Sequence, residues 1–208
     1  PHLLKTFYAA KELDKELLAL VRKTDIRITK VDPKKAQALA RGGNHQGLLA
    51  EIEYPLVNVP SIKNLERIIV LVGITDMGNI GAIIRSSYAL GVDALFICGS
   101  KQLNIEGAVR SSSGAIFDLP IALHENVHDL HHELQQAGFS TVGATLNGEE
   151  KISNNAKTAL FMGSESLGLP RRLVEKLTEQ TSIKMKNNFD SLNVSSAAAI
   201  LIDRMNHA

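Results

Sequence analysis

The sequence is poor in cysteine, in aromatic side chains and in long apolar runs, and each shortage excludes a class of protein. Its 208 residues include one cysteine, Cys98, so an internal disulfide and a cysteine-rich zinc site are both excluded. No segment approaches the roughly 20 consecutive apolar residues that a membrane-spanning helix requires. Tryptophan is absent and aromatic residues make up 4% of the chain, which disfavours a nucleic-acid surface built mainly from aromatic stacking.

Net charge is also small. The 23 Lys and Arg residues are balanced by 22 Asp and Glu residues, giving a formal net charge of +1, so a nucleic-acid partner would need a local basic patch. The candidates for phosphate contacts are Lys30, Lys34, Lys35, Arg41, Arg110, Arg171 and Arg172. A solvated surface would explain the same side chains. The beginning of the sequence carries early charges and has no signal-peptide pattern, which favours a cytoplasmic protein.

Apolar patterning divides the chain into a small first unit and a larger second unit. Residues 1–54 are predicted to form a small α/β domain, residues 55–66 a linker with two prolines, and residues 67–208 the main domain. In the first unit we expect a helix around residues 13–21, a strand at 25–31, a helix from Asp32 and Pro33, and a strand at 47–53.

The second unit alternates apolar strands with helices. Strands are expected at residues 67–74, 94–99, 140–146, 158–163 and 181–185, and helices at 80–91, 124–138, 170–177 and 191–208. This alternation predicts an α/β fold in which helices flank a parallel sheet. Residues 76–79 are expected to form a loop, Ser191 to cap the last helix, and Asn193 to lie in that helix's first turn.

Three loops follow the carboxyl ends of predicted strands, where open α/β sheets bind their ligands. They read GNIGAIIRSS (78–87), MGSESLGLP (162–170) and KNNFDSLNVSS (186–196). Glycine, serine and asparagine bring backbone amides and short polar side chains close to a ligand at low steric cost. The three loops together predict a ligand site.

Each residue of these loops also has an ordinary structural explanation. GNIGAI does not fit the dinucleotide pattern G-x-G-x-x-G, and a simple strand-to-helix turn would account for it. Arg85 is either a solvated helix charge or a clamp for phosphate or carboxylate, which a guanidinium group fits well. Glu165 could serve as a capping carboxylate, and capping alone would explain Ser191.

The histidines do not predict a metal site. His124, His128, His131 and His132 fall on one predicted amphipathic helix, but the run H-D-L-H-H departs from the zinc motif H-E-x-x-H. We therefore expect these side chains to lie on a solvated helix face, with no metal bound. Cys98 lies in an apolar strand and is expected to be a buried packing residue.

The three loops, taken in order, resemble the signature motifs of a known family. GNIGAIIR, LFMGSESLGLP and IKMKNNFDSLNVSSAAAILI are similar to the three motifs of the SpoU/TrmH branch of SPOUT RNA methyltransferases. The resemblance extends from about residue 67 to the C-terminus. Upstream, NHQG at 44–47 and the following apolar strand resemble the end of the small ribosomal-protein-like substrate-binding domain of the ribosomal-RNA members. On this comparison the domain's first strand and helix are missing.

The resemblance implies methylation of a ribose 2′-hydroxyl in RNA with S-adenosylmethionine as the methyl donor and without a metal. It also implies a deep C-terminal trefoil knot and a homodimer whose site lies at the subunit interface. The favoured substrate is a guanosine in large-subunit ribosomal RNA, with transfer RNA as the alternative. Two other classes stay open, a non-catalytic RNA-binding module and a nucleotide-binding oxidoreductase, although the latter lacks its glycine fingerprint.

By position, the resemblance assigns roles to nine residues. The catalytic set is Asn79, Arg85, Glu165, Ser191 and Asn193, and the cofactor-binding set is Thr145, Gly163, Ile183 and Leu192. Arg85 would bind the target phosphate and lower the cost of forming an alkoxide, while the others orient Arg85 and the cofactor. The sequence departs from the usual motifs at Met77, where many members have proline, at Ser166, where glycine is usual, and at Lys184, where proline often follows the isoleucine.

Overall fold

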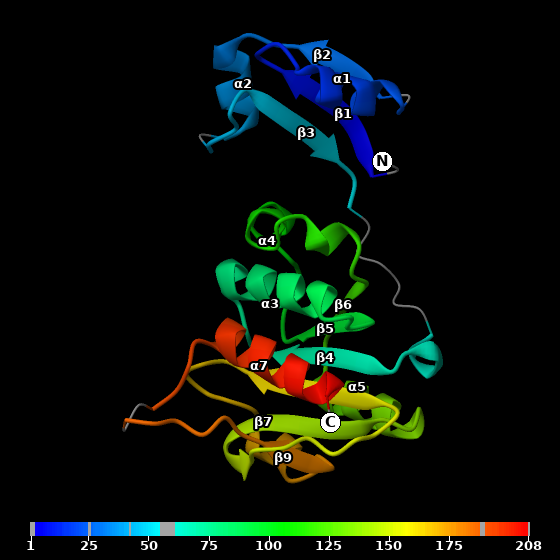
Figure 1. The fold of residues 1–208 in the computed structure, drawn as a ribbon, viewed down its shortest axis with the longest axis vertical. Coiled ribbons are helices and arrows are strands. Elements are labelled where there is room, and N and C mark those ends of the chain that lie inside the picture. Colours follow the sequence, from blue (N-terminus) through cyan, green and yellow to red (C-terminus); the bar gives the residue numbers. More distant parts are fainter. Residues whose placement is uncertain (1–2, 25, 42, 55–60, 188–189, 208) are drawn as a thin grey trace. The chain divides into compact units, whose positions relative to one another are not determined.

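The computed structural model describes residues 3–24, 26–41, 43–54, 61–187 and 190–207. The chain divides into two compact units, Pro1–Pro55 and Leu56–Ala208. Both are visible in Figure 1, coloured along the chain.

The described part of the first unit is a three-stranded sheet with two helices. Its strands β1 (Leu4–Ala9), β2 (Arg27–Lys30) and β3 (Leu48–Ile52) lie in the order β2-β1-β3, with β2 parallel and β3 antiparallel to β1. The helices are α1 (Lys15–Arg22) and α2 (Pro33–Leu39). Phe7, Ala9 and Val21 form the buried core. Strand β1 was not predicted from the sequence.

Helix ends in this unit follow from short acidic side chains. The Asp14 carboxylate accepts a hydrogen bond from the backbone N–H of Leu17 at 2.7 Å, and Asp32 accepts one from Lys35 at 2.8 Å. These bonds satisfy amide groups that the first turn of a helix leaves without partners. The predicted start of α2, with Asp32 as its cap and Pro33 at its first position, is confirmed.

The described part of the second unit contains a six-stranded sheet in the order β6-β5-β4-β8-β7-β9, in which every recorded pair is parallel. The strands are β4 (Arg67–Val72), β5 (Ala94–Cys98), β6 (Ile121–His124), β7 (Ser140–Glu149), β8 (Thr158–Gly163) and β9 (Glu179–Thr181). The predicted α/β class and parallel sheet are confirmed. The trefoil knot stays a prediction.

The described part of the second unit also contains five helices. They are α3 (Met77–Ala89), α4 (Ile105–Ser111), α5 (Val127–Gln136), α6 (Arg171–Val174) and α7 (Val194–Asn206), with short 3₁₀ turns η1 (Ile62–Asn64) and η2 (Ala115–Phe117). In Figure 1, α3 lies between α4 and α7, and it packs against both. Helix α7 also packs on β8. Because α7 is the last helix, the end of the chain returns to the centre of the sheet.

Two helix starts differ from the predictions. Helix α3 begins at Met77, so the expected loop at 76–79 is wrong, because the Asp76 carboxylate accepts the Asn79 N–H at 2.7 Å and caps the helix. Helix α7 begins at Val194 with Asn193 as its cap, because the Asn193 side chain accepts the Ser195 N–H at 2.9 Å. Ser191 is therefore not the cap, and Asn193 precedes the first turn.

Three shorter elements also differ from the predictions. Helix α4 and strand β6 were not predicted, and His124 ends β6 where a helix was expected to begin. Strand β9 ends at Thr181, where the predicted strand was to start.

The order of the strands places two loops side by side at the carboxyl edge of the sheet. From β4 the chain builds β5 and β6 on one side, whereas β8 and β7 lie on the other side. Val72 at the end of β4 is paired with Gly163 at the end of β8. The loops after β4 and β8 therefore leave the sheet at its topological switch point, which is where sheets of this type bind ligands.

Candidate active site

Three of the predicted site residues meet at this switch point. Asn79 lies in the first turn of α3, Glu165 in the loop after β8, and Asn193 at the cap of α7. The Asn193 Nδ2 group donates hydrogen bonds to Asn79 Oδ1 at 2.9 Å and to Glu165 Oε1 at 3.0 Å. The three loops of the predicted site are thus joined through one side chain.

The loop that carries Glu165 is folded back tightly on the end of β8. Ser164 and Gly168 form an isolated antiparallel bridge, and Gly168 has φ +63°. A Cβ atom on Gly163 would collide with the backbone of Gly168 and Leu169, so a side chain at Gly163 would displace the loop. This return leaves the Glu165 side chain exposed at the edge of the sheet.

Glu165 is also tied to the N-terminus of α7. Its Oε1 atom accepts a second hydrogen bond, from the backbone N–H of Val194 at 3.0 Å. A carboxylate at this position interacts favourably with the helix dipole and satisfies one of the free amide groups. The capping role considered from the sequence is therefore present, together with the contact to the site residue Asn193.

Arg85 and Ser191 are not part of this cluster. Arg85 lies six residues beyond Asn79 on α3, which turns its side chain by about 120° around the helix axis. Both Arg85 and Ser191 are exposed, and neither side chain forms a hydrogen bond or ion pair within the part of the chain that the structure describes.

Most of the predicted cofactor residues lie at a strand end or on the segment that leads to α7. Gly163 ends β8, and Ile183 and Leu192 are half-buried. Thr145 lies in the middle of β7, not at a strand end as expected, and donates a hydrogen bond from Oγ1 to Gln180 Oε1 at 3.3 Å. Its hydroxyl is therefore already used within the chain.

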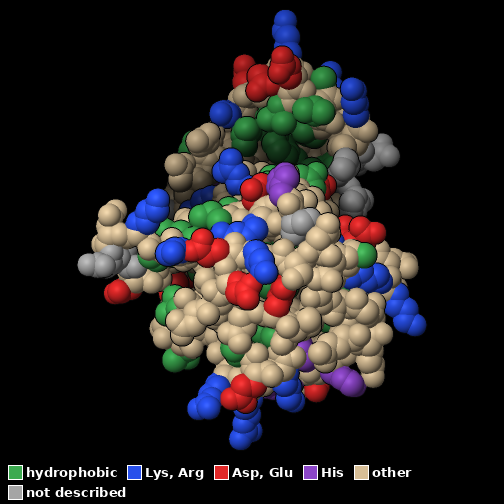
Figure 2. Space-filling view, turned by 60° about the horizontal axis from the view of Figure 1, so that its bottom comes forward, with side chains coloured by type: hydrophobic (Ala, Val, Ile, Leu, Met, Phe, Trp, Pro, Cys, Tyr) green, Lys and Arg blue, Asp and Glu red, His purple; other side chains and the backbone are tan. Residues whose placement is uncertain are grey.

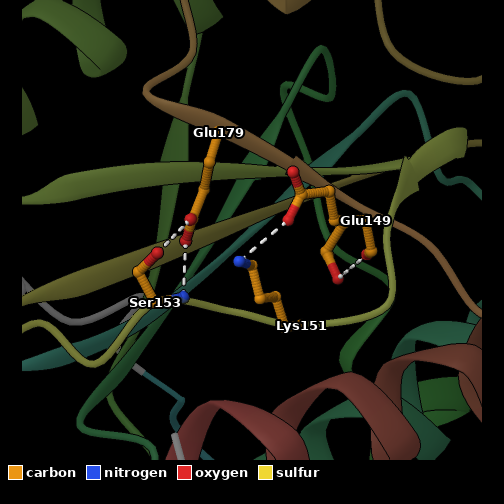
Figure 3. Close-up of polar contacts among 5 residues, drawn as sticks. Glu149, Lys151, Ser153 and Glu179 are labelled. Carbon is orange, nitrogen blue, oxygen red and sulfur yellow. Dashed lines mark hydrogen bonds and ion pairs between the residues drawn. The ribbon is translucent and has the colours of Figure 1, made fainter.

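The end of β7 is held to β9 by a set of polar contacts drawn in Figure 3. Both oxygens of Glu179 accept hydrogen bonds from Ser153, from its N–H at 3.1 Å and its hydroxyl at 2.7 Å. Lys151 forms an exposed ion pair with Glu149 at 3.2 Å. These groups line a hollow of about 430 Å³, but each charged group already has a partner within the chain.

Sequence reasoning missed two residues that support the cluster, Asp76 and Ser195. Asp76 caps the turn that carries Asn79, and Ser195 donates both its N–H and its hydroxyl to Asn193 Oδ1. Asp76 had a detectable signal, because it precedes a helix by one position and short acidic residues favour such sites. The sequence contains no such signal for Ser195, because the role of this residue depends on which residue caps α7.

The histidines of the predicted helix differ in their exposure to solvent. His131 is 3% exposed, its Nε2 atom lies 3.3 Å from Thr141 Oγ1, and its ring meets Phe161 edge-on. Burial lowers the pKa of His131, so the prediction of a solvated helix face is wrong for this residue. Within the described ranges, no group of three or more His, Cys, Asp or Glu side chains is arranged to hold a metal ion.

Cys98 is buried, as predicted. Burial raises the pKa of its thiol to about 12, so the reactive thiolate is disfavoured at neutral pH.

The basic side chains proposed for RNA contacts are exposed. Lys34 and Lys35 lie on α2, whereas Arg171 is engaged with Glu175 in an ion pair at 3.0 Å. Figure 2 shows one face, on which Lys and Arg side chains are interspersed with Asp and Glu. None of the helices in the described ranges is both long enough and apolar enough to cross a membrane.

Comparison with known proteins agrees with this geometry. Residues 66–203 match the model of the SpoU rRNA methylase family, and residues 1–55 match the model for RNA 2′-O ribose methyltransferase substrate binding. The chain therefore belongs to the SpoU rRNA methylase family, as the three loops indicated.

Individual relatives cover most of the chain. It is 28% identical over 190 residues to an uncharacterized tRNA/rRNA methyltransferase of Archaeoglobus fulgidus, covering 90% of this chain and 82% of the relative. It is 27% identical over 198 residues to the 23S rRNA (guanosine-2′-O-)-methyltransferase RlmB of Neisseria meningitidis, covering 90% and 79%.

Solved structures show the same fold. The AdoMet-bound rRNA methyltransferase from Sinorhizobium meliloti superposes with a TM-score of 0.80 at 24% identity, covering 98% of this chain and 80% of that one. The SpoU methyltransferase AviRb from Streptomyces viridochromogenes, in complex with AdoMet, gives a TM-score of 0.80 at 25% identity, covering 98% and 82%.

Proposed function

We propose that this protein transfers a methyl group from S-adenosylmethionine to the ribose 2′-hydroxyl of a guanosine in large-subunit ribosomal RNA. As a SpoU-family member it is an S-adenosylmethionine-dependent RNA 2′-O-ribose methyltransferase. The observation that carries the site assignment is the cluster of Asn79, Glu165 and Asn193 at the switch point. Relatives named as 23S rRNA guanosine methyltransferases favour the finer substrate.

The residues present suit the cofactor. Oε1 of Glu165 is occupied by protein donors, which leaves the other carboxylate oxygen to accept from a ligand cation. Gly163, Ile183 and Leu192, all partly buried, are proposed to hold the cofactor through backbone groups, and Thr145 of β7 to reach it. The bound cofactor supplies an already activated sulfonium methyl group.

Arg85 is proposed to act on the RNA. A ribose hydroxyl is a very weak acid, so developing negative charge on its oxygen must be stabilised, and a fixed cation does this without reorganisation. Because arginine ordinarily stays protonated in proteins, Arg85 would bind the target phosphate and stabilise the alkoxide, and the hydroxyl proton would pass either to that phosphate or to an Arg85 that has lost its own proton on desolvation. Its exposed, unengaged guanidinium fits that role.

The homodimer is part of this proposal. Arg85 does not join the cluster of its own chain, and a second copy would allow it to complete a neighbouring site. Large apolar side chains are exposed on the two adjoining helices, with Tyr88 on α3 50% exposed and Ile200 on α7 41% exposed. Burying them against a partner would be favourable.

The N-terminal unit, residues 1–54, is proposed to hold the RNA. Its match to a substrate-binding model and the exposed Lys34 and Lys35 support this. Substituting both lysines should weaken RNA binding more at low salt than at high salt, because phosphate contacts release counterions. Equal weakening at both salt concentrations would contradict these contacts.

The experiment that tests the function is methyl transfer from labelled S-adenosylmethionine to ribosomal and transfer RNA from a strain that lacks the gene. Label in large-subunit RNA that maps to a 2′-O-methylguanosine would support the proposal. Label in transfer RNA would favour the second candidate, which relatives named tRNA/rRNA methyltransferases support. Cofactor binding without transfer to either pool would point to an assembly-stage RNA as the substrate, whereas absence of cofactor binding would contradict the proposal. RNA with a 2′-deoxynucleotide at the target should bind without accepting label.

A further inference from the structure

The side chain of Asn193 has all its hydrogen-bonding positions filled by the chain itself. Its Oδ1 atom accepts from the Ser195 N–H at 2.9 Å and from the Ser195 hydroxyl at 2.6 Å. Its Nδ2 group donates to Asn79 Oδ1 at 2.9 Å and to Glu165 Oε1 at 3.0 Å. A carboxamide has two acceptor positions and two donor protons, so Asn193 has no hydrogen-bond donor or acceptor left for a ligand.

Ser195 determines which way this amide points. If the amide were reversed, Nδ2 would face the donor N–H of Ser195, and Oδ1 would face the two acceptor oxygens of Asn79 and Glu165. Both contacts would be repulsive. With two Ser195 donors on Oδ1, the orientation that holds Asn79 and Glu165 together is the favoured one.

The free groups of the cluster then belong to Asn79 and Glu165. Within the described ranges, Asn79 Nδ2 and Glu165 Oε2 form no hydrogen bond. One can donate to a ligand and the other can accept from it. We infer that Ser195 is a positioning residue for methyl transfer: its hydroxyl holds the Asn193 amide, and Asn193 in turn holds Asn79 and Glu165. This inference deepens the proposed function and rests on it for the reaction concerned.

The hydroxyl of Ser195 is not needed to cap α7. The cap requires only that Asn193 Oδ1 accept the backbone N–H of Ser195, and an alanine at position 195 retains that N–H. Alanine also has a higher helix propensity than serine. Ser195→Ala should therefore leave the helix intact and remove one of the two hydrogen bonds that hold the Asn193 amide. The substitution thus distinguishes a positioning role of the hydroxyl from a structural role.

The test compares Ser195→Ala with Ser195→Thr, which restores a hydroxyl, and with Ser196→Ala, which removes an exposed hydroxyl from the next position of α7. Loss of one net hydrogen bond should lower kcat by about 2- to 15-fold in Ser195→Ala. KM for RNA and the melting temperature should stay near wild type, and Ser195→Thr should recover turnover. A kcat in Ser195→Ala equal to that of Ser196→Ala would overturn the inference, as would equal losses in the Ala and Thr variants.

A second readout does not depend on activity. In ¹⁵N-labelled protein, the Asn193 carboxamide signals, assigned with Asn193→Asp, should shift in Ser195→Ala and not in Ser196→Ala. Unchanged signals would show that Ser195 does not hold the amide. Absence of methyl transfer by the wild-type protein would instead overturn the proposed function, and with it the role in transfer, while the amide signals still decide the contact.

Discussion

Glu165 offers the sharpest test of the site because its two roles respond differently to two substitutions. Its Oε1 atom accepts one hydrogen bond from Val194 N–H and one from Asn193 Nδ2, both at 3.0 Å. Glu165→Gln keeps an oxygen that can accept both bonds and removes only the charge. Glu165→Ala removes the acceptor and the charge together.

The structural cost of each substitution is modest. The side chain is exposed, so Glu165→Gln, which loses mainly the interaction with the helix dipole, should lower the free energy of unfolding by about 0.3–1 kcal/mol. Glu165→Ala loses that interaction and two hydrogen bonds, about 1.3–3 kcal/mol in total. At 2–4 °C per kcal/mol for a domain of this size, the melting temperature should fall by roughly 3–12 °C for Ala and roughly 1–4 °C for Gln.

The effect on methyl transfer should be larger and should not follow stability. A charged hydrogen bond that Glu165 Oε2 accepts from a ligand is worth about 1.5–3 kcal/mol, so Glu165→Gln should lower kcat/KM for S-adenosylmethionine by about 10- to 150-fold. The assays are thermal unfolding and methyl transfer at saturating RNA. Glu175→Gln, which removes the exposed partner of Arg171, is the matched control. If Glu165→Gln retains wild-type kcat/KM while Glu165→Ala loses stability, Glu165 is only a helix cap and our reasoning is wrong.

Three further results are expected. Arg85→Ala should leave S-adenosylmethionine affinity by calorimetry within about 2-fold and lower turnover by about 100- to 1,000-fold, as loss of an oxyanion-stabilising group does; near wild-type turnover would remove Arg85 from the mechanism. Gly163→Ala should force the loop at Gly168 away from β8 and weaken cofactor binding. An unchanged dissociation constant for S-adenosylmethionine would contradict the proposed role of Gly163 in holding the cofactor. Burial lowers the pKa of His131 in the folded state, so the unfolded chain binds the proton more readily. The stability contributed by neutral His131 is therefore fully present above about pH 6.5 and is lost as the pH falls below that value. Urea unfolding of wild type and His131→Gln should show a steeper decline at low pH for wild type, and parallel curves would contradict this.

Long apolar runs made the sheet of the second unit predictable. Residues 68–72 and 158–162 are buried throughout, and such apolar runs identify parallel strands without knowledge of their neighbours. Short elements lack that signal. Strand β1 is held by pairing with both β2 and β3, and helix α4 by packing on α3 at Gly81 and Ser111, so both depend on contacts that sequence patterns do not contain.

The sequence allowed three residues of the proposed site to be selected, but it did not show how they are arranged. Asn79, Glu165 and Asn193 were selected from loops that follow strands, and the structure brings all three together. Ser191 was chosen as a cap over Asn193 because both residue types favour that position, and only the backbone path decides between them. The sequence did not show on which side of α3 Arg85 lies relative to Asn79. The predicted helix began three residues too late, so Asn79 was placed in a loop instead of on the same helix.

The hydrogen bonds at Asn193 also have a consequence for timing. Ribosomes add Asn79 and Glu165 to the chain well before Asn193, and α7 can dock on α3 only after it has been synthesised. A growing chain therefore has both ligand-facing groups but lacks the side chain that joins them.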